Sequence, residues 1–171
     1  MSDLPSTVEI HEEGPREGFQ IEPGPISTVD KVKLIDALSK TGLKHIQACS
    51  FVNPRLVPGW ADAEKVVESF DAHEDVEYTG LYFNGNGLDR ALAFKDKLTI
   101  SGSISLTASE GFTKKNLNRT HAENMAAMER HVMSHLELGI PVNRIGVMAA
   151  FGCNYQGDIS PATVIKTLED G

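Results

Sequence analysis

The chain has 171 residues, of which 40% are hydrophobic and 23% charged. This composition is typical of a globular protein and excludes collagen-like, disordered and coiled-coil classes, and the length allows one domain or two very small ones. Sixteen Lys and Arg residues against twenty-four Asp and Glu give a net charge of −8. The chain therefore lacks the basic character of a nucleic-acid-binding protein, and we expect no nucleic-acid partner.

Cysteine usage and the apolar pattern indicate a cellular compartment. Cys49 and Cys153 lie far apart and form neither a disulfide framework nor a CxxC pair. The first residues show no basic segment followed by an apolar one, as a signal peptide would. No apolar run is long enough for a membrane helix. These features predict a cytoplasmic protein with no membrane partner.

Five short β-like segments alternate with helical segments along the chain. We expect strands at residues 8–13, 45–52, 77–83, 97–106 and 144–150. We expect helices at residues 28–41, 60–70, 88–94 and 120–138, and from residue 161 onward. The helix over 120–138 is the clearest, because Met125, Met128, Val132 and Leu136 recur at helical spacing.

This alternation predicts an α/β fold with a parallel sheet covered by helices. A doubly wound open sheet and a (β/α)8 TIM barrel both fit. Long polar segments after the strands favour the barrel, whose chemistry lies at the carboxyl ends of its strands. Such a barrel needs roughly 250 residues. We therefore expect residues 1–171 to be the N-terminal portion of a single, truncated barrel domain, with about five βα units, unless a second copy completes the sheet.

The first polar segment that could carry chemistry is GPREGFQ at residues 14–20, directly after the first strand. It places Arg16 beside Glu17. A guanidinium can stabilise an oxyanion through two hydrogen bonds, and a carboxylate can hold a hard divalent cation. From spacing alone, a loop with one solvated ion pair is the favoured interpretation.

Three further segments follow later strands. Gln47 and Cys49 are expected on one face of the second strand. Lys114 and Lys115, in the segment ASEGFTKKN, suit a phosphate-bearing ligand, although adjacent lysines are usually solvated surface. Cys153, in the segment FGCNYQG, is interpreted as a small packed residue in a turn.

Taken in order, these segments resemble the 3-hydroxy-3-methylglutaryl-CoA lyase family. The resemblance runs from about residue 8 to the end, through GPREGFQ, ISTVDKVKLIDALSKTGL, SFVNPRLVPGWAD, ASEGFTKKN and FGCNYQGDISP. It implies a TIM barrel, a Mg²⁺ or Mn²⁺ ion, an acyl-CoA substrate and a homo-oligomer. The implied reaction is a retro-Claisen cleavage of 3-hydroxy-3-methylglutaryl-CoA to acetyl-CoA and acetoacetate.

The resemblance also implies roles for individual residues. Arg16 would be the catalytic arginine that stabilises the developing enolate, and Glu17 would be the metal carboxylate. Eight further residues would bind substrate: Gln20, Gln47, Ser50, Phe51, Asn84, Lys114, Lys115 and Asn116. Lys114, Lys115 and Asn116 would lie near the CoA moiety.

Several departures from the family pattern leave alternatives open. The family has Asp where this chain has Glu17, Glu where it has Gln47, and a small polar residue where it has Met148. The His-x-His metal pair, late metal Asn and catalytic Cys loop belong to the second half of the family's barrel. One alternative is a divergent or non-catalytic paralogue or fragment, and another is a lyase for a different 3-hydroxyacyl-CoA. A third is a related branch that condenses acetyl-CoA with a keto acid, but GFTKKN favours the lyases.

Two histidine pairs have simpler interpretations than metal binding. His131 and His135 are four residues apart, a spacing that can bind zinc, but no third ligand is evident. We interpret them as partly solvated helix surface. His11 and His45 fall on strand faces and are interpreted as ordinary polar or core positions.

Overall fold

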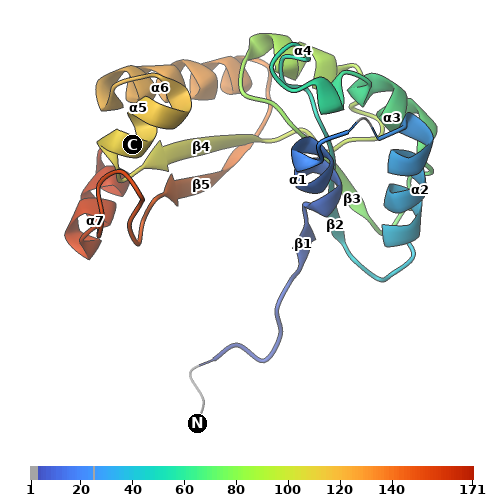
Figure 1. Ribbon diagram of the computed structural model, residues 1–171, viewed down its shortest axis with the longest axis horizontal. Helices are drawn as coiled ribbons and strands as arrows, with labels where there is room; N and C mark the ends of the chain where they lie inside the picture. Colours follow the sequence, from blue (N-terminus) through green and yellow to red (C-terminus); the bar gives the residue numbers. More distant parts are fainter. Residues whose placement is uncertain (1–3, 25) are drawn as a thin grey trace. The chain divides into compact units, whose positions relative to one another are not determined.

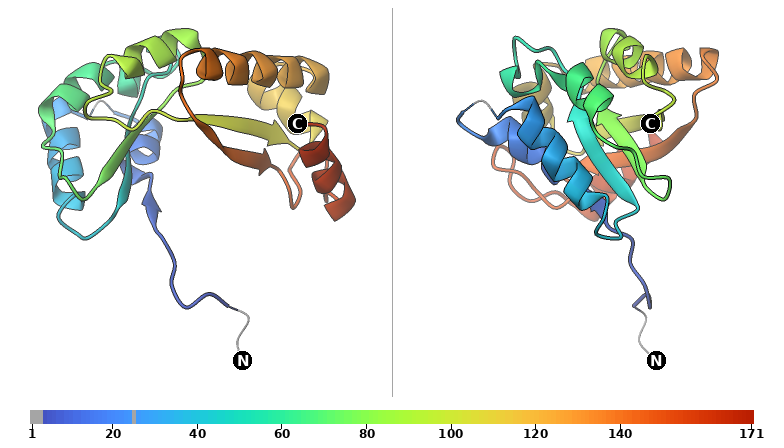
Figure 2. Two further views of the ribbon diagram at one scale, coloured as in Figure 1. Left: turned by 180° about the vertical axis from the view of Figure 1, so that it is seen from behind. Right: turned by 90° about the vertical axis from the view of Figure 1, so that its right-hand side faces the viewer.

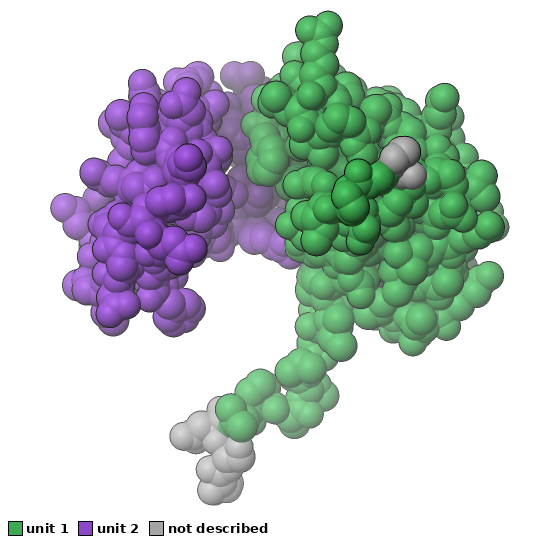
Figure 3. Space-filling view, viewed as in Figure 1, with its two compact units in different colours: residues 1–100 green, residues 101–171 purple. Residues whose placement is uncertain are grey.

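The computed structural model describes residues 4–24 and 26–171. The chain divides into two compact units, residues 1–100 and residues 101–171 (Figure 3). Each unit is a parallel βα arrangement. No helix in the described residues is long and apolar enough to cross a membrane.

Unit 1 is built on a three-stranded parallel sheet in the order β1-β2-β3 (Figure 1). The strands are β1 (His11–Glu12), β2 (His45–Ser50) and β3 (Glu77–Leu81). The helices are α1 (Gly14–Ile21), α2 (Thr28–Leu38), α3 (Ala63–Ser69) and α4 (Gly85–Leu92), with a 3-10 turn at Pro58–Trp60.

The core of unit 1 surrounds β2, against which α1, α2 and α3 pack. Four of the six residues of β2 are buried, as expected for a parallel strand covered by helices. The largest fully buried side chains of this core are Trp60, Phe70, Ile35, Ile46, Val66 and Val67.

Unit 2 is built on two parallel strands that pair along their length. The strands are β4 (Gly102–Thr107) and β5 (Val142–Met148), and the helices are α5 (Glu110–Leu117), α6 (His121–Glu137) and α7 (Pro161–Glu169). Helices α6 and α7 pack against this pair, and Figure 2 shows α6 running along it. A capping box begins α6: the Thr120 hydroxyl accepts from the backbone N–H of Glu123 at 3.2 Å, and the Glu123 carboxylate accepts from that of Thr120 at 2.7 Å.

The alternation of strands and helices is confirmed, but some expected bounds are wrong. Strand β1 covers only His11–Glu12, and β4 begins at Gly102 rather than at residue 97. The two segments expected as loops at residues 14–20 and 108–116 contain helices α1 and α5. Proline is compatible with the first turn of a helix, where no intrahelical N–H bond is lost, and a capping serine begins the second one.

The interpretation of His135 as partly solvated surface is wrong. Its side chain is 0% exposed, and its Nδ1 lies 2.7 Å from the carbonyl oxygen of His131. Leu136, by contrast, is 58% exposed. Helix α6 approaches β4 closely here, because a Cβ on Gly102 would lie 2.9 Å from the His135 ring. A glycine on the facing strand thus makes room for a large side chain on the helix.

Candidate functional site

Arg16 lies in the first turn of α1, just beyond the carboxyl end of β1. Its side chain is only 14% exposed. Its Nε donates to Oε1 of Gln47 on β2 at 2.5 Å, its Nη2 donates to Oε2 of Glu13 at 2.8 Å, and its Nη1 pairs with Glu17. The guanidinium is therefore held in one orientation by three side-chain oxygens.

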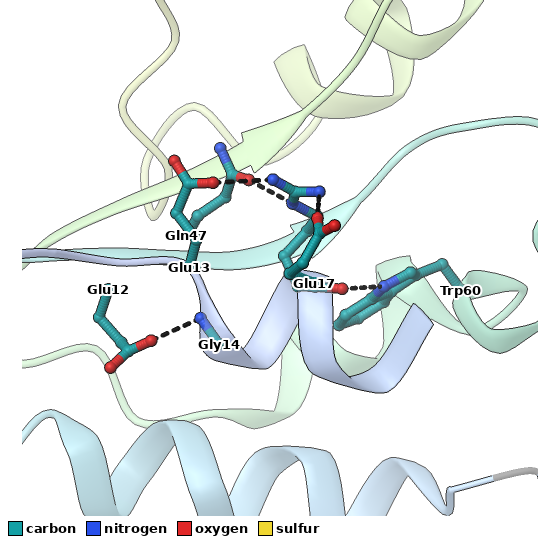
Figure 4. A network of polar contacts seen from close by, with 7 residues as sticks. Glu12, Glu13, Gly14, Glu17, Gln47 and Trp60 are labelled. Atoms are coloured by element: carbon teal, nitrogen blue, oxygen red, sulfur yellow. Dashed lines mark hydrogen bonds and ion pairs between the residues drawn. The ribbon is translucent and has the colours of Figure 1, made fainter. Parts of the chain in front are cut away.

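Trp60 holds helix α1 in place. Its Nε1 donates a hydrogen bond to the backbone carbonyl of Arg16 at 3.0 Å; Figure 4 shows the Trp60 side chain pointing to helix α1. The centroid of its ring lies 6.1 Å from that of Phe19. Pro15, at the start of the helix, is buried. These contacts explain why a segment with two glycines and a proline forms a helix here, since tertiary packing outweighs weak helix propensity.

A buried lysine fixes Trp60 in turn. The Lys31 Nζ donates to Gly59 O and to Asp62 Oδ1, both at 2.5 Å, and lies 4.8 Å from the centroid of the Trp60 ring. Burial opposes ionisation of Asp62, but hydrogen bonds from Lys31 and from Thr28 outweigh it and lower the pKa of that carboxyl. The charged pair thus fixes the turn that carries Trp60.

The carboxyl end of β2 carries two more of the residues expected to bind substrate. Ser50 is 0% exposed, and its hydroxyl has no hydrogen-bond partner among the described residues. Phe51 is 2% exposed and stacks on Phe94 at 6.2 Å, and its carbonyl accepts from Arg90 at 3.1 Å. Phe51 is therefore part of the hydrophobic core, whereas Ser50 offers a buried hydroxyl.

Gln47 and Cys49 differ in their surroundings, although they were expected on one strand face. A register shift in the pairing of β2 with β3 lies between them. Gln47 reaches Arg16, whereas Cys49 is buried in the core, and burial raises the pKa of its thiol. Only Gln47 belongs to the polar cluster.

Asn84 and Gln20 lie on the surface of unit 1. The Asn84 side chain caps α4 by accepting a hydrogen bond from the N–H of Gly87 at 3.0 Å, and Gln20 is exposed on α1. The structure therefore assigns Asn84 a clear structural role at a helix start.

The other three expected residues belong to unit 2. Lys114 and Lys115 lie in the last turn of α5, followed by Asn116, and all three are exposed. Asn118 is the C-cap of this helix, and its φ of 50° is left-handed. Lysines in a last turn are favoured by the helix dipole, so their position has a structural explanation as well as a functional one.

The structure also reveals polar partners that sequence reasoning missed. Ser109 caps α5, is 0% exposed, and donates to Oε1 of Gln156 at 2.9 Å. Its Oγ lies 3.0 Å from Sγ of Cys153, and this hydrogen bond is the main cause that lowers the thiol's pKa. Glu13 was also missed, although its position three residues before Arg16 was a usable signal.

The oxygens around Arg16 are of the kind that hold a hard divalent cation. Glu13 and Glu17 carry carboxylates whose side chains are 46% and 54% exposed, so an ion can approach them from solvent. In the structure each of these carboxylates also pairs with the guanidinium. The donor set fits such an ion in chemical kind and supplies a minority of its usual ligands.

Comparison with known proteins identifies the chain's relatives. No family model matches it. It is 40% identical over 169 residues to a mitochondrial hydroxymethylglutaryl-CoA lyase of Macaca fascicularis. The alignment covers 99% of this chain and 51% of the relative. It is 39% identical over 167 residues to a cytoplasmic 3-hydroxy-3-methylglutaryl-CoA lyase of Rattus norvegicus, covering 97% of this chain and 47% of the relative. Over nearly its whole length, the chain is similar to hydroxymethylglutaryl-CoA lyases. It spans about half the length of these relatives.

Solved structures show the same similarity. A hydroxymethylglutaryl-CoA lyase from Pseudomonas aeruginosa matches with a TM-score of 0.87 and 30% identity, over 99% of this chain and 55% of that one. An HMG-CoA lyase from Acinetobacter baumannii, in complex with coenzyme A and 3-methylmalate, matches with a TM-score of 0.80 and 30% identity, over 99% and 54%. The expected fold class, a parallel TIM-barrel-type arrangement with only part of the barrel strands present, is confirmed.

Proposed function

We propose that the protein cleaves a 3-hydroxy-3-methylglutaryl-CoA-type acyl-CoA to acetyl-CoA and acetoacetate. The observation that carries this proposal is the position of Arg16. A guanidinium that is largely buried and rigidly held lies at the carboxyl end of a parallel strand, in a chain related throughout to lyases. Barrel enzymes place their catalytic groups at that end.

Arg16 would act on the charge that the cleavage creates. When the carbon–carbon bond breaks, its electron pair passes to the thioester carbonyl and forms an enolate oxygen. A fixed cation stabilises this oxygen without first having to reorganise, and a side chain only 14% exposed is screened little by water. Gln47 and Glu13 would keep the guanidinium aimed while substrate binds.

Glu17 would hold the divalent ion that the family resemblance implies, Mg²⁺ or Mn²⁺. Such an ion would polarise the substrate hydroxyl and lower the cost of removing its proton. The support from the structure is the half-exposed carboxylate of Glu17 beside Arg16. The family resemblance places further ligands, a His-x-His pair and an Asn, in the second half of the barrel, and water and substrate would complete the set, as is usual for Mg²⁺.

We also propose residues that bind the acyl-CoA substrate. Support comes from the lyase solved with coenzyme A, from the buried Ser50 hydroxyl without a partner among the described residues, and from the two exposed lysines of α5. The proposed set is Gln20, Gln47, Ser50, Phe51, Asn84, Lys114, Lys115 and Asn116.

We propose a lyase for another 3-hydroxyacyl-CoA as the second candidate. It is favoured by Gln47, a neutral residue at the position where the family carries a carboxylate, bonded here directly to Arg16. Comparing kcat/KM for several 3-hydroxyacyl-CoA thioesters separates the two candidates.

The organisation of the whole protein is also a proposal. We infer a single barrel domain that includes residues 1–171, assembled as a homo-oligomer without a nucleic-acid or membrane partner. A cytoplasmic location is supported by the similarity to the Rattus norvegicus relative whose name describes it as cytoplasmic.

The test of the proposed function is Arg16→Gln. Because the glutamine amide keeps polar contacts but not the charge, we expect kcat to fall about a thousandfold with the circular dichroism spectrum unchanged. Arg130→Gln, at an exposed arginine of α6, is the matched control and should keep normal turnover. Near-normal turnover by Arg16→Gln would show that the assignment of Arg16 is wrong.

A further inference from the structure

The amino ends of the strands in unit 1 carry a second polar cluster, whereas Arg16 lies at the carboxyl end of β1. His11 begins β1, His45 begins β2 and Glu77 begins β3, and the pairing places the three in one register row. The two imidazole rings are stacked, with centroids 4.2 Å apart and planes inclined by 14°. Strand pairing alone thus brings two metal-binding side chains together.

Glu9 completes this cluster from the segment that precedes β1. One of its carboxylate oxygens contacts Nε2 of His45, and the other lies 3.8 Å from Nε2 of His11. The ligand atoms of these three residues all lie within 4.8 Å of one another. Two imidazoles and one carboxylate form a donor set that proteins use for zinc.

Glu77 gives the cluster the outer contact that metal-binding histidines usually have. Its Oε2 lies 3.1 Å from Nδ1 of His45, on the side of the ring away from Glu9. A hydrogen bond from Nδ1 to a carboxylate places the ring proton there and leaves the Nε2 lone pair pointing to a metal ion. The orientation of His45 is therefore the one that ligation requires.

We propose that Glu9, His11 and His45 bind one divalent transition-metal ion, with Zn²⁺ as the ion that fits best. Glu77 is the positioning residue for His45. The exposed fractions of the side chains, 63% for Glu9, 43% for His11 and 23% for His45, leave the ion a path from solvent and room for a water ligand. This site replaces the interpretation of the two histidines as ordinary strand positions.

The site differs from the proposed Mg²⁺ or Mn²⁺ site in place and in chemistry. Imidazole nitrogens select Zn²⁺ and other transition metals, whereas oxygen ligands select Mg²⁺. A bound ion would connect the segment before β1, which carries Glu9, with the first residues of β1 and β2. Because binding to the native state stabilises it, Zn²⁺ should raise the melting temperature.

The test is calorimetric titration of the metal-free protein with Zn²⁺ in the presence of excess Mg²⁺, together with the visible spectrum of the Co²⁺-substituted protein. We expect one equivalent of tightly bound Zn²⁺ and the intense absorption of four-coordinate Co²⁺. His11→Ala and His45→Ala should each abolish this stoichiometric binding. Glu77→Gln should weaken it about 10- to 100-fold, because it removes an outer-shell carboxylate.

Two variants serve as matched controls. His73→Gln changes an exposed histidine outside the cluster, and Glu17→Gln changes a carboxylate near the carboxyl end of β1. Both variants should bind Zn²⁺ as the unchanged protein does. Circular dichroism checks that every variant is folded. The proposal is overturned if the folded protein binds no stoichiometric Zn²⁺. It is also overturned if binding survives both histidine substitutions.

Discussion

Arg16 is bonded to three side chains that differ in how readily they can be exchanged for substrate. Gln47 lies on a strand and is partly buried, whereas Glu17 is 54% exposed and next to Arg16 in sequence. An exposed ion pair contributes little free energy. Glu17 is therefore the partner that can turn to a cation or give way to a substrate oxyanion at least cost.

This argument predicts the effect of Glu17→Asp on metal affinity. The shorter side chain has fewer rotamers to lose, and Mg²⁺ requires nearly ideal octahedral geometry. We expect Mg²⁺ to bind several-fold more tightly, as measured by calorimetry, with Glu13→Asp as the comparison. Unchanged affinity in Glu17→Asp would remove Glu17 from the ligands.

The Lys31–Asp62 pair makes a prediction about stability. Lys31→Met keeps the aliphatic stem but leaves Asp62, whose side chain is 23% exposed, without its cation. We expect the free energy of unfolding to fall by about 2 kcal/mol, since a partly buried carboxylate loses its charged donor. The control is Lys33→Met, in an exposed pair with Asp30, which should cost less than about 0.5 kcal/mol. Equal losses in urea denaturation would contradict this account.

Some of these residues could be predicted from the sequence and others could not. Arg16 and Glu17 stand out because they are adjacent and follow a strand. The contact of Arg16 with Gln47 joins residues 31 positions apart and depends on the pairing of β1 with β2. The burial of His135 depends on Gly102 of a facing strand, and no helical periodicity within residues 120–138 contains that information.

At the scale of elements, the alternation of strands and helices was predictable from the sequence, but helices α1 and α5 were not. The glycines and proline of residues 14–20 are typical of a loop. Helix α1 forms because Trp60 bonds its backbone and Phe19 packs on Trp60. Strand β1 is shorter than the alternating pattern predicts, because it pairs with β2 at only His11 and Glu12.

Helix α4 provides a test of element packing through two glycines in its first turn. A Cβ on Gly87 would lie 2.9 Å from Tyr82 Cβ and 3.0 Å from Phe51 O, whereas one on Gly85 would meet nothing within 4 Å. We expect Gly87→Ala to destabilise the protein by about 1–3 kcal/mol through overpacking. Gly85→Ala should be neutral or should stabilise the protein by up to about 1 kcal/mol. Thermal unfolding of both variants measures the difference, and equal melting temperatures would contradict the packing described for α4.

At the scale of the whole molecule, charge has to be considered with function. The chain has a net charge of −8, yet the proposed substrate carries the phosphates of CoA. An anionic ligand then needs a local group of cations. Lys114 and Lys115 on the exposed end of α5 provide one in unit 2. The sequence predicted this pair, but their relation to a helix end became visible only in the structure.

The most direct test of the central claim is a product assay on the protein as its gene encodes it, supplied with 3-hydroxy-3-methylglutaryl-CoA and either Mg²⁺ or Mn²⁺. Acetyl-CoA and acetoacetate are quantified separately, so that carbon–carbon cleavage is distinguished from thioester hydrolysis. The account predicts equal amounts of the two products, and their formation should cease when the divalent ion is chelated. A folded protein that forms neither product with either ion would contradict the account.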